Sequence, residues 1–161
     1  MAKGGLFTGK EIIEMAIQSE QNGYAFYEKA ADQARTEHTK RLFEWLADQE
    51  RHHEETFRSM LTDEKEHRPP EGYEGQKETF VQALLETHVL PDAQTGVAAL
   101  ANMSSDLEAI QFALGFEKDT IIFMYEMRNT VPENQGTAVD ALIAEEKSHV
   151  VRLNEIRTTL V

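Results

Sequence analysis

One spacing constrains this chain more than any other. A glutamate and a histidine three residues apart interrupt an otherwise apolar helical row, and this happens twice, at Glu50 with His53 and at Glu146 with His149. Residues three apart lie on one face of an α-helix. Polar side chains on a core-facing row cost free energy unless they are paired. The chain must therefore fold into helices that bring partners to these four side chains.

Four segments of the chain carry the apolar period of a helix. They are expected at about 9–35, from about 36–38 to about 61, from 104–105 to about 129, and from about 133–136 to the end. Thr8 with Glu11 and Ser105 with Glu108 have the spacing of a capping box, which marks a helix start. Because the links between the first and second and between the third and fourth segments are short, each pair is expected to form an antiparallel hairpin.

The middle link differs from the other two in length and composition. Its HRPPEGYEG stretch is loop, because it is rich in proline and glycine. Gln76 to Val89 predicts a short helix that stops before Pro91. A link of this length can cross the whole bundle, so we expect an all-α four-helix bundle. The single domain, residues 1–161, divides into a hairpin at about 9–61, a crossover at about 62–104 and a hairpin at about 105–161.

Composition excludes several classes of function. With no cysteine, the chain has no disulfide, no iron–sulfur cluster and no cysteine nucleophile. A formal net charge of −13 argues against nucleic-acid binding and suits a protein that handles cations. No apolar run is long enough to span a membrane, and the N-terminal stretch lacks the apolar core of a signal peptide. We expect a cytoplasmic protein.

The two hairpins resemble each other in sequence. AIQSEQNGYAFY, residues 16–27, recurs as ALGFEKDTIIFM with an offset of 97 residues. LADQERHH, residues 46–53, recurs as LIAEEKSH with an offset of 96 residues. The first match adds Glu20 and Glu117 to the polar set. A repeat that keeps its glutamates and histidines at nearly one offset indicates a duplicated hairpin.

These polar side chains are expected to meet in the middle of the bundle. The helical rise of about 1.5 Å per residue puts Glu20 level with the polar pair of its own hairpin, and Glu117 level with the other pair. Four buried carboxylates repel each other and favour the protonated form, unless cations balance them. Carboxylate and imidazole together suit iron or manganese, and zinc less selectively. The predicted metal ligands are Glu20, Glu50, His53, Glu117, Glu146 and His149.

Other residues near these rows are assigned less specific roles. Tyr24 and Tyr27 lie on the face of Glu20 and are expected in the core, with their hydroxyls in reach of a ligand carboxylate. Glu145 precedes Glu146 but lies outside the apolar row, and is expected to be solvated. A third Glu-x-x-His match, Glu64 to His67, lies in loop composition and is interpreted as chance. Without metal, the alternative for each polar pair is a buried salt link.

The third predicted helix carries a second apolar row. It consists of Phe112, Phe116, Phe123 and Met127. A helix that is apolar on two sides packs against something beyond its own bundle. Either the crossover or a second subunit could cover this row, and we expect a homodimer.

The ligand pattern resembles the ferritin-like di-iron carboxylate superfamily. Within it, AIQSEQNGYAFYEKAAD and LADQERHHEETF are similar to the first two helices of rubrerythrin-like proteins. The resemblance covers both hairpins. It implies a ferritin-like bundle in which Glu50 and Glu146 bridge two metal ions, and Glu20 and Glu117 are terminal ligands.

Two departures from rubrerythrins proper are visible. The four-cysteine rubredoxin-like domain is absent, and Thr120 stands where those proteins place an extra glutamate. The site is therefore more symmetric, like that of bacterioferritin.

By resemblance, the expected cofactor is two iron ions, with manganese or zinc as alternatives. The expected function is a non-haem di-iron redox protein that reacts with hydrogen peroxide or dioxygen, in oxidative stress or iron handling. With no cysteine in the chain, the electrons must come from an external donor. The alternative is an iron-storage or manganese-binding protein of the same fold without turnover.

Overall fold

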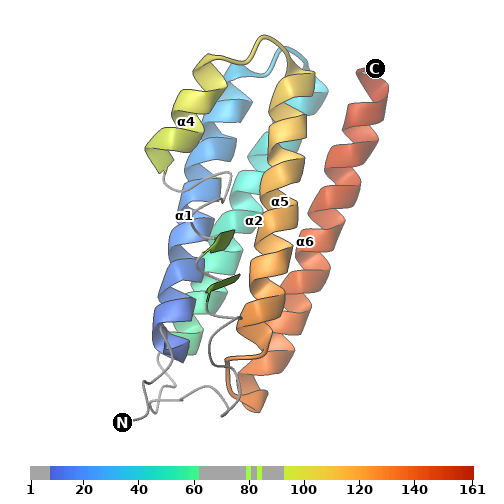
Figure 1. The fold of residues 1–161 in the computed structure, drawn as a ribbon. Coiled ribbons are helices and arrows are strands. Elements are labelled where there is room, and N and C mark those ends of the chain that lie inside the picture. The colour runs from blue at the N-terminus through green and yellow to red at the C-terminus, as the bar shows by residue number, and fades with distance from the viewer. Residues whose placement is uncertain (1–7, 62–78, 81–82, 85–92) are drawn as a thin grey trace.

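The computed structural model describes residues 8–61, 79–80, 83–84 and 93–161 (Figure 1). Within these residues, five helices are long enough to name: α1 (Gly9–Gln33), α2 (Glu37–Leu61), α4 (Ala93–Ala101), α5 (Asp106–Arg128) and α6 (Glu133–Thr159). The four long helices match the predicted segments to within about two residues. None of the described helices combines the length and the apolar character that a bilayer crossing requires.

The long helices form an all-α bundle of two hairpins, as predicted. In Figure 1, α1 runs antiparallel to α2 and α5 runs antiparallel to α6, with all four roughly aligned. α1 packs along α2 and α5 packs along α6, while α2 against α6 and α1 against α5 join the hairpins. The short helix α4 lies against α1 near one end of the bundle.

Two helix starts follow the predicted capping chemistry. The Thr8 hydroxyl accepts from the N–H of Glu11, and the Glu11 carboxylate accepts from the N–H of Thr8 at 2.6 Å, a complete capping box. At α5, the Ser105 hydroxyl accepts from the N–H of Glu108 at 3.2 Å. The Glu108 carboxylate accepts from the N–H of Ser104 instead, so the reciprocal bond is displaced by one residue.

The crossover was predicted less well than the hairpins. The expected helix at 76–89 lies mostly outside the described residues, of which 79–80 and 83–84 are helical. Helix α4, which buries Gly96 and Leu100, was not predicted from the sequence. This segment is short and mostly apolar, so it shows no clear helical period in the sequence, and in the structure it packs against α1. The Glu64–His67 match lies outside the described residues.

The core consists of two apolar clusters with a polar layer between them. One cluster takes residues 26–31 of α1, 42–47 of α2, 109–116 of α5 and 153–156 of α6. The other takes residues 12–17 of α1, 57–60 of α2, 123–131 in and just after α5, and 139–143 of α6. On every long helix, the predicted metal ligands fall in the gap between the two clusters. Apolar packing on both sides thus sets the height at which the polar side chains meet.

The second apolar row of α5 is covered by the chain itself. Phe116 and Met127 are fully buried, and Phe123 is nearly so. Phe112 is partly buried and packs on Phe26, with the ring centroids 5.2 Å apart. The row therefore has partners within one chain, and the expected homodimer stays a prediction.

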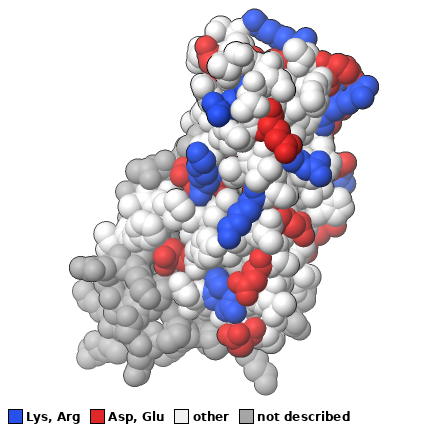
Figure 2. All heavy atoms as spheres, turned by 90° about the vertical axis from the view of Figure 1, so that its right-hand side faces the viewer, with Lys and Arg blue, Asp and Glu red and all other residues white. Residues whose placement is uncertain are grey.

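The outer faces of the bundle carry charges of both signs. On the face shown in Figure 2, lysine and arginine side chains alternate with aspartate and glutamate. The described ion pairs include Arg128 with Asp140 at 3.0 Å and Arg58 with Glu54 at 2.7 Å. The charged residues of this face are therefore interspersed, as on the polar side of amphipathic helices.

Candidate metal centre

The polar layer brings all six predicted ligands together. Each has at most 1% of its surface exposed to solvent. Their donor atoms form two overlapping groups, each with all atoms within 4.8 Å of one another. Glu146 belongs to both groups. The first group is Glu20, His53 and Glu146, and the second is Glu50, Glu117, Glu146 and His149.

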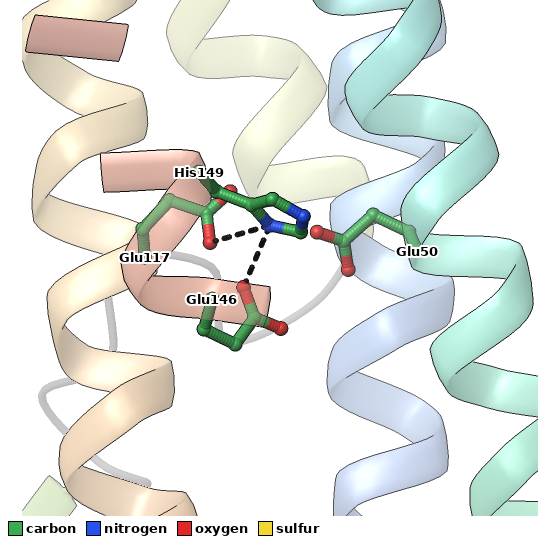
Figure 3. Close-up of side chains that lie close together, drawn as sticks. All are labelled: Glu50, Glu117, Glu146 and His149. Carbon is green, nitrogen blue, oxygen red and sulfur yellow. Dashed lines mark ion pairs between the residues drawn. The ribbon is translucent and has the colours of Figure 1, made fainter. Parts of the chain in front are cut away.

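Glu146 lies between the two histidines. Its Oε1 is 2.8 Å from Nδ1 of His53, and its Oε2 is 2.8 Å from Nδ1 of His149. The imidazole rings are nearly parallel, with centroids 5.3 Å apart. Each Nδ1 also faces a second carboxylate, at 3.4 Å for Glu20 and 3.5 Å for Glu117. Figure 3 shows Glu50, Glu117, Glu146 and His149 converging from three helices on one space.

The donor atoms are crowded but poorly hydrogen-bonded. Most of the buried side-chain polar atoms without a hydrogen-bond partner, among the described residues, belong to these six side chains. They include both oxygens of Glu20, both oxygens of Glu146 and Nδ1 of each histidine. Buried polar atoms are normally satisfied. Lone pairs that converge without a partner are what a bound cation requires, so the residues present fit a metal centre.

Burial and mutual repulsion disfavour charge on two of the carboxylates. Burial raises the pKa of Glu50 well above its usual range, and the nearby carboxylates of Glu20 and Glu146 raise it further. Burial likewise raises the pKa of Glu117 to about 8, helped by the charge of Glu146. These two groups hold protons near neutral pH when no cation balances them.

The pKa values of the two histidines are raised, whereas the pKa of Glu146, which lies between them, is lowered. Burial alone would lower the pKa of His53, but the carboxylates of Glu146 and Glu20 raise it to about 11. The pKa of His149 is raised to about 9 by Glu117 and Glu146, again against burial. Burial would raise the pKa of Glu146, yet the two histidines hold it below its usual range. Without metal, the attraction between the protonated histidines and Glu146 offsets part of the repulsion in the layer, and metal binding must release these protons.

A glycine in α1 makes room for one of the ligands. A Cβ atom on Gly23 would lie 2.6 Å from Oε2 of Glu50 and 2.9 Å from a ring carbon of Phe116. Both neighbours are buried. Gly23 therefore lets α1 approach the Glu50 carboxylate more closely than any other residue type would allow.

The two tyrosines proposed for the surroundings of the site differ in position. Tyr27 is fully buried, and its hydroxyl donates to Oε1 of Glu117. Burial raises the pKa of Tyr27 well above its usual range, so this hydroxyl keeps its proton. Tyr24 is half-buried, and its hydroxyl donates to Glu28 at 2.9 Å, away from the six side chains. Tyr27 thus meets the expectation of contact with a predicted ligand, whereas the expectation for Tyr24 is wrong.

Two residues next to the centre, Glu145 and Trp45, have contacts there that the sequence pattern did not predict. Glu145 was assigned to solvent, and its side chain is 52% exposed, yet its Oε2 accepts from Nε2 of His53 at 3.0 Å. Trp45 of α2 places its ring perpendicular to that of His149, with centroids 5.2 Å apart. The signal for Glu145 was its place beside Glu146, on the flank of α6 that turns toward α2. A single-helix pattern does not show which neighbouring helix covers that flank.

Comparison with known proteins agrees with this geometry. The family model described as rubrerythrin matches residues 11–156. A solved structure described as a ferritin-like diiron-carboxylate protein from Thermotoga maritima is 26% identical, with a TM-score of 0.67. That match covers 98% of this chain and 99% of the other. A search of curated proteins gave no match. The family model spans the chain from α1 to α6, and the long helices enclose the buried cluster of glutamates and histidines. This chain therefore belongs to the rubrerythrin family, within the ferritin-like di-iron proteins.

Proposed function

We propose that this protein is a di-iron oxidoreductase that is oxidised by hydrogen peroxide or dioxygen and re-reduced by an external donor. The observation that carries the proposal is the buried layer of four glutamates and two histidines, with Glu146 shared between both halves. One such half would serve a structural ion. Two halves that share a carboxylate support a pair of ions close enough to act on one oxidant.

Each ligand has a proposed role in this arrangement. Glu50 and Glu146 would bridge the two ions, and Glu20 and Glu117 would each complete one side together with a histidine. The bound iron pair would supply two electrons, one from each ion. The chain supplies the rest, because the apolar clusters on both sides exclude bulk water and the Tyr27 hydroxyl fixes one oxygen of Glu117.

Thr120 bears on the choice of oxidant. It is buried at the position where rubrerythrins proper are expected to carry an extra glutamate, so no carboxylate is available there to follow an ion as its charge changes. We expect reactivity with peroxide to be kept and its margin over dioxygen to be narrow. Stopped-flow oxidation of the ferrous protein by each oxidant, followed at the ferric absorption, measures that margin.

The possible outcomes of this experiment separate the candidate functions. Oxidation by peroxide at a rate similar to or above that by dioxygen supports the proposal. A strong preference for dioxygen would move the assignment to a ferroxidase of the ferritin type. Reaction with neither oxidant would contradict the enzyme proposal and leave a protein that binds or stores metal.

Metal stoichiometry gives a direct test of the site itself. Trp45 is the single tryptophan of the chain and lies edge-on to His149, so an open-shell ion bound there is expected to quench its fluorescence. Titration with Co²⁺ should quench the emission up to two ions per chain. Zn²⁺, a closed-shell ion with similar ligand preferences, should bind without quenching and serves as the control.

Two variants check the assignment of that signal. Glu50→Ala combined with Glu146→Ala removes both proposed bridging ligands and should abolish saturable quenching. Glu44→Gln removes an exposed carboxylate of α2 that pairs with Lys40, and should leave the titration unchanged. Equal titration curves for the double variant and the natural chain would contradict the assigned ligands.

A further inference from the structure

The two halves of the centre have matching ligands, but the residues that support those ligands differ. By the repeat offset of 96 residues, Glu145 corresponds to Gln49. By the offset of 97 residues, Tyr27 corresponds to Met124. At the first pair of equivalent positions, one half has a glutamate and the other a glutamine. At the second pair, one half has a tyrosine hydroxyl and the other a methionine thioether. Glu145 contacts His53 and Tyr27 contacts Glu117, so each difference involves a residue that touches a proposed ligand.

On the side of Glu20 and His53, both ligands are well prepared to donate electrons to an ion. Nε2 of His53 donates a hydrogen bond to the Glu145 carboxylate at 3.0 Å. This bond fixes the ring with the Nδ1 lone pair toward the centre, and a charged acceptor raises the basicity of Nδ1. Within the described part of the chain, neither carboxylate oxygen of Glu20 has a hydrogen-bond partner, so both can bind metal.

On the side of Glu117 and His149, both ligands are weaker donors. Among the described residues, Nε2 of His149 is buried and has no hydrogen-bond partner. The ring that packs edge-on against that of His149 belongs to Trp45, which offers no carboxylate. One oxygen of Glu117 already accepts a hydrogen bond from the Tyr27 hydroxyl. That bond withdraws electron density from the carboxylate and lowers its donor strength toward an ion.

We propose that the two metal positions are unequal, with the ion at Glu20 and His53 held tightly and the ion at Glu117 and His149 held weakly. The inference rests on the proposed function as a two-metal protein. Glu145 acts as a positioning residue, because it touches His53 and not the ion. The centre fills in a fixed order, and the ion at His149 is the one that leaves first when metal is scarce.

Calorimetric titration of the metal-free protein with Co²⁺ tests this order. Two classes of site are expected, with dissociation constants that differ by about tenfold or more, the usual effect of a carboxylate behind a ligating histidine. Glu145→Gln should weaken the tight class by about 10- to 100-fold and leave the weak class in place. The visible Co²⁺ spectrum of the first equivalent should change as well, which a purely structural effect on folding would not cause.

The repeat supplies reciprocal variants. Gln49→Glu puts a carboxylate at the position that corresponds to Glu145, and is expected to tighten the weak class. Tyr27→Phe frees the second oxygen of Glu117 and should act in the same direction. Glu44→Gln is the matched control on α2, and should leave both classes unchanged.

Ligand variants assign each class to its side. His149→Gln should remove the weak class and keep the tight class, and His53→Gln should do the reverse. Two equal classes in the natural chain, or unchanged affinities in Glu145→Gln, would overturn this inference and leave the proposed function intact. Failure of the natural chain to bind Co²⁺ at all would instead contradict the proposed function on which the inference rests.

Discussion

The metal-loaded protein is expected to melt roughly 10 °C above the metal-free protein at neutral pH. A ligand that binds only the folded chain at about a thousand times its dissociation constant adds about 4 kcal/mol to the free energy of unfolding. For a chain of this length, each kcal/mol corresponds to about 2–4 °C. Differential scanning calorimetry of the Mn²⁺-loaded protein and of protein treated with a chelator measures the difference in melting temperature.

The melting temperature of the metal-free protein should fall as pH rises from about 5 to about 8.5. The pKa of folded Glu117 is raised from 4.5 to about 8, so its contribution to stability is complete below about pH 4.5 and is lost as pH rises through 8. The pKa of folded His149 is raised from 6.5 to about 9, which gives a loss in the same direction at higher pH. Glu146, with a lowered pKa, contributes stability that is lost only as pH falls below 4.5.

Metal reverses this dependence, because bound ions need deprotonated ligands. The difference in melting temperature between loaded and metal-free protein should therefore grow with pH. Glu117→Gln, which resembles the protonated side chain, should flatten the pH profile of the metal-free protein. Equal melting temperatures with and without metal from pH 5 to 8.5 would contradict a clustered centre.

Gly23→Ala is expected to impair metal binding about tenfold or more, the usual effect of disturbing a residue next to a ligand. Alanine in a helix interior normally stabilises by about 1 kcal/mol relative to glycine. Here its Cβ would meet the Glu50 carboxylate at 2.6 Å and a fully buried Phe116 ring, and overpacking of this kind costs about 1–3 kcal/mol. The carboxylate must shift, so the metal affinity measured by calorimetry should fall together with the melting temperature.

Gly136→Ala provides the matched control in α6. Its Cβ would meet the guanidinium of Arg128, the far end of a flexible side chain that is partly exposed and can move into solvent. Metal affinity should be unchanged and the melting temperature should differ little. If both alanine variants bind metal as the natural chain does, Gly23 has no part in positioning Glu50.

The long helices and the set of polar side chains in the middle of the bundle could be predicted from the sequence. Helical period and capping residues are local properties, so the starts at Thr8 and Ser105 were predicted from a few neighbouring residues. The Glu-x-x-His pairs were also local, and the repeat linked them to Glu20 and Glu117. Fixed helical rise then placed all six at one height, where the structure brings them together.

Properties that depend on which helix covers which could be decided only by the tertiary structure. The row of Phe112 and Phe116 is apolar in any environment, and only the packed bundle shows that α1 and its neighbours cover it within one chain. α4 has too little polar contrast to reveal its buried side. Glu145 looks solvated on its own helix and becomes a partner of His53 only because α2 lies beside α6. A sequence fixes contacts along a helix, whereas contacts between helices depend on crossing and rotation, which no local pattern records.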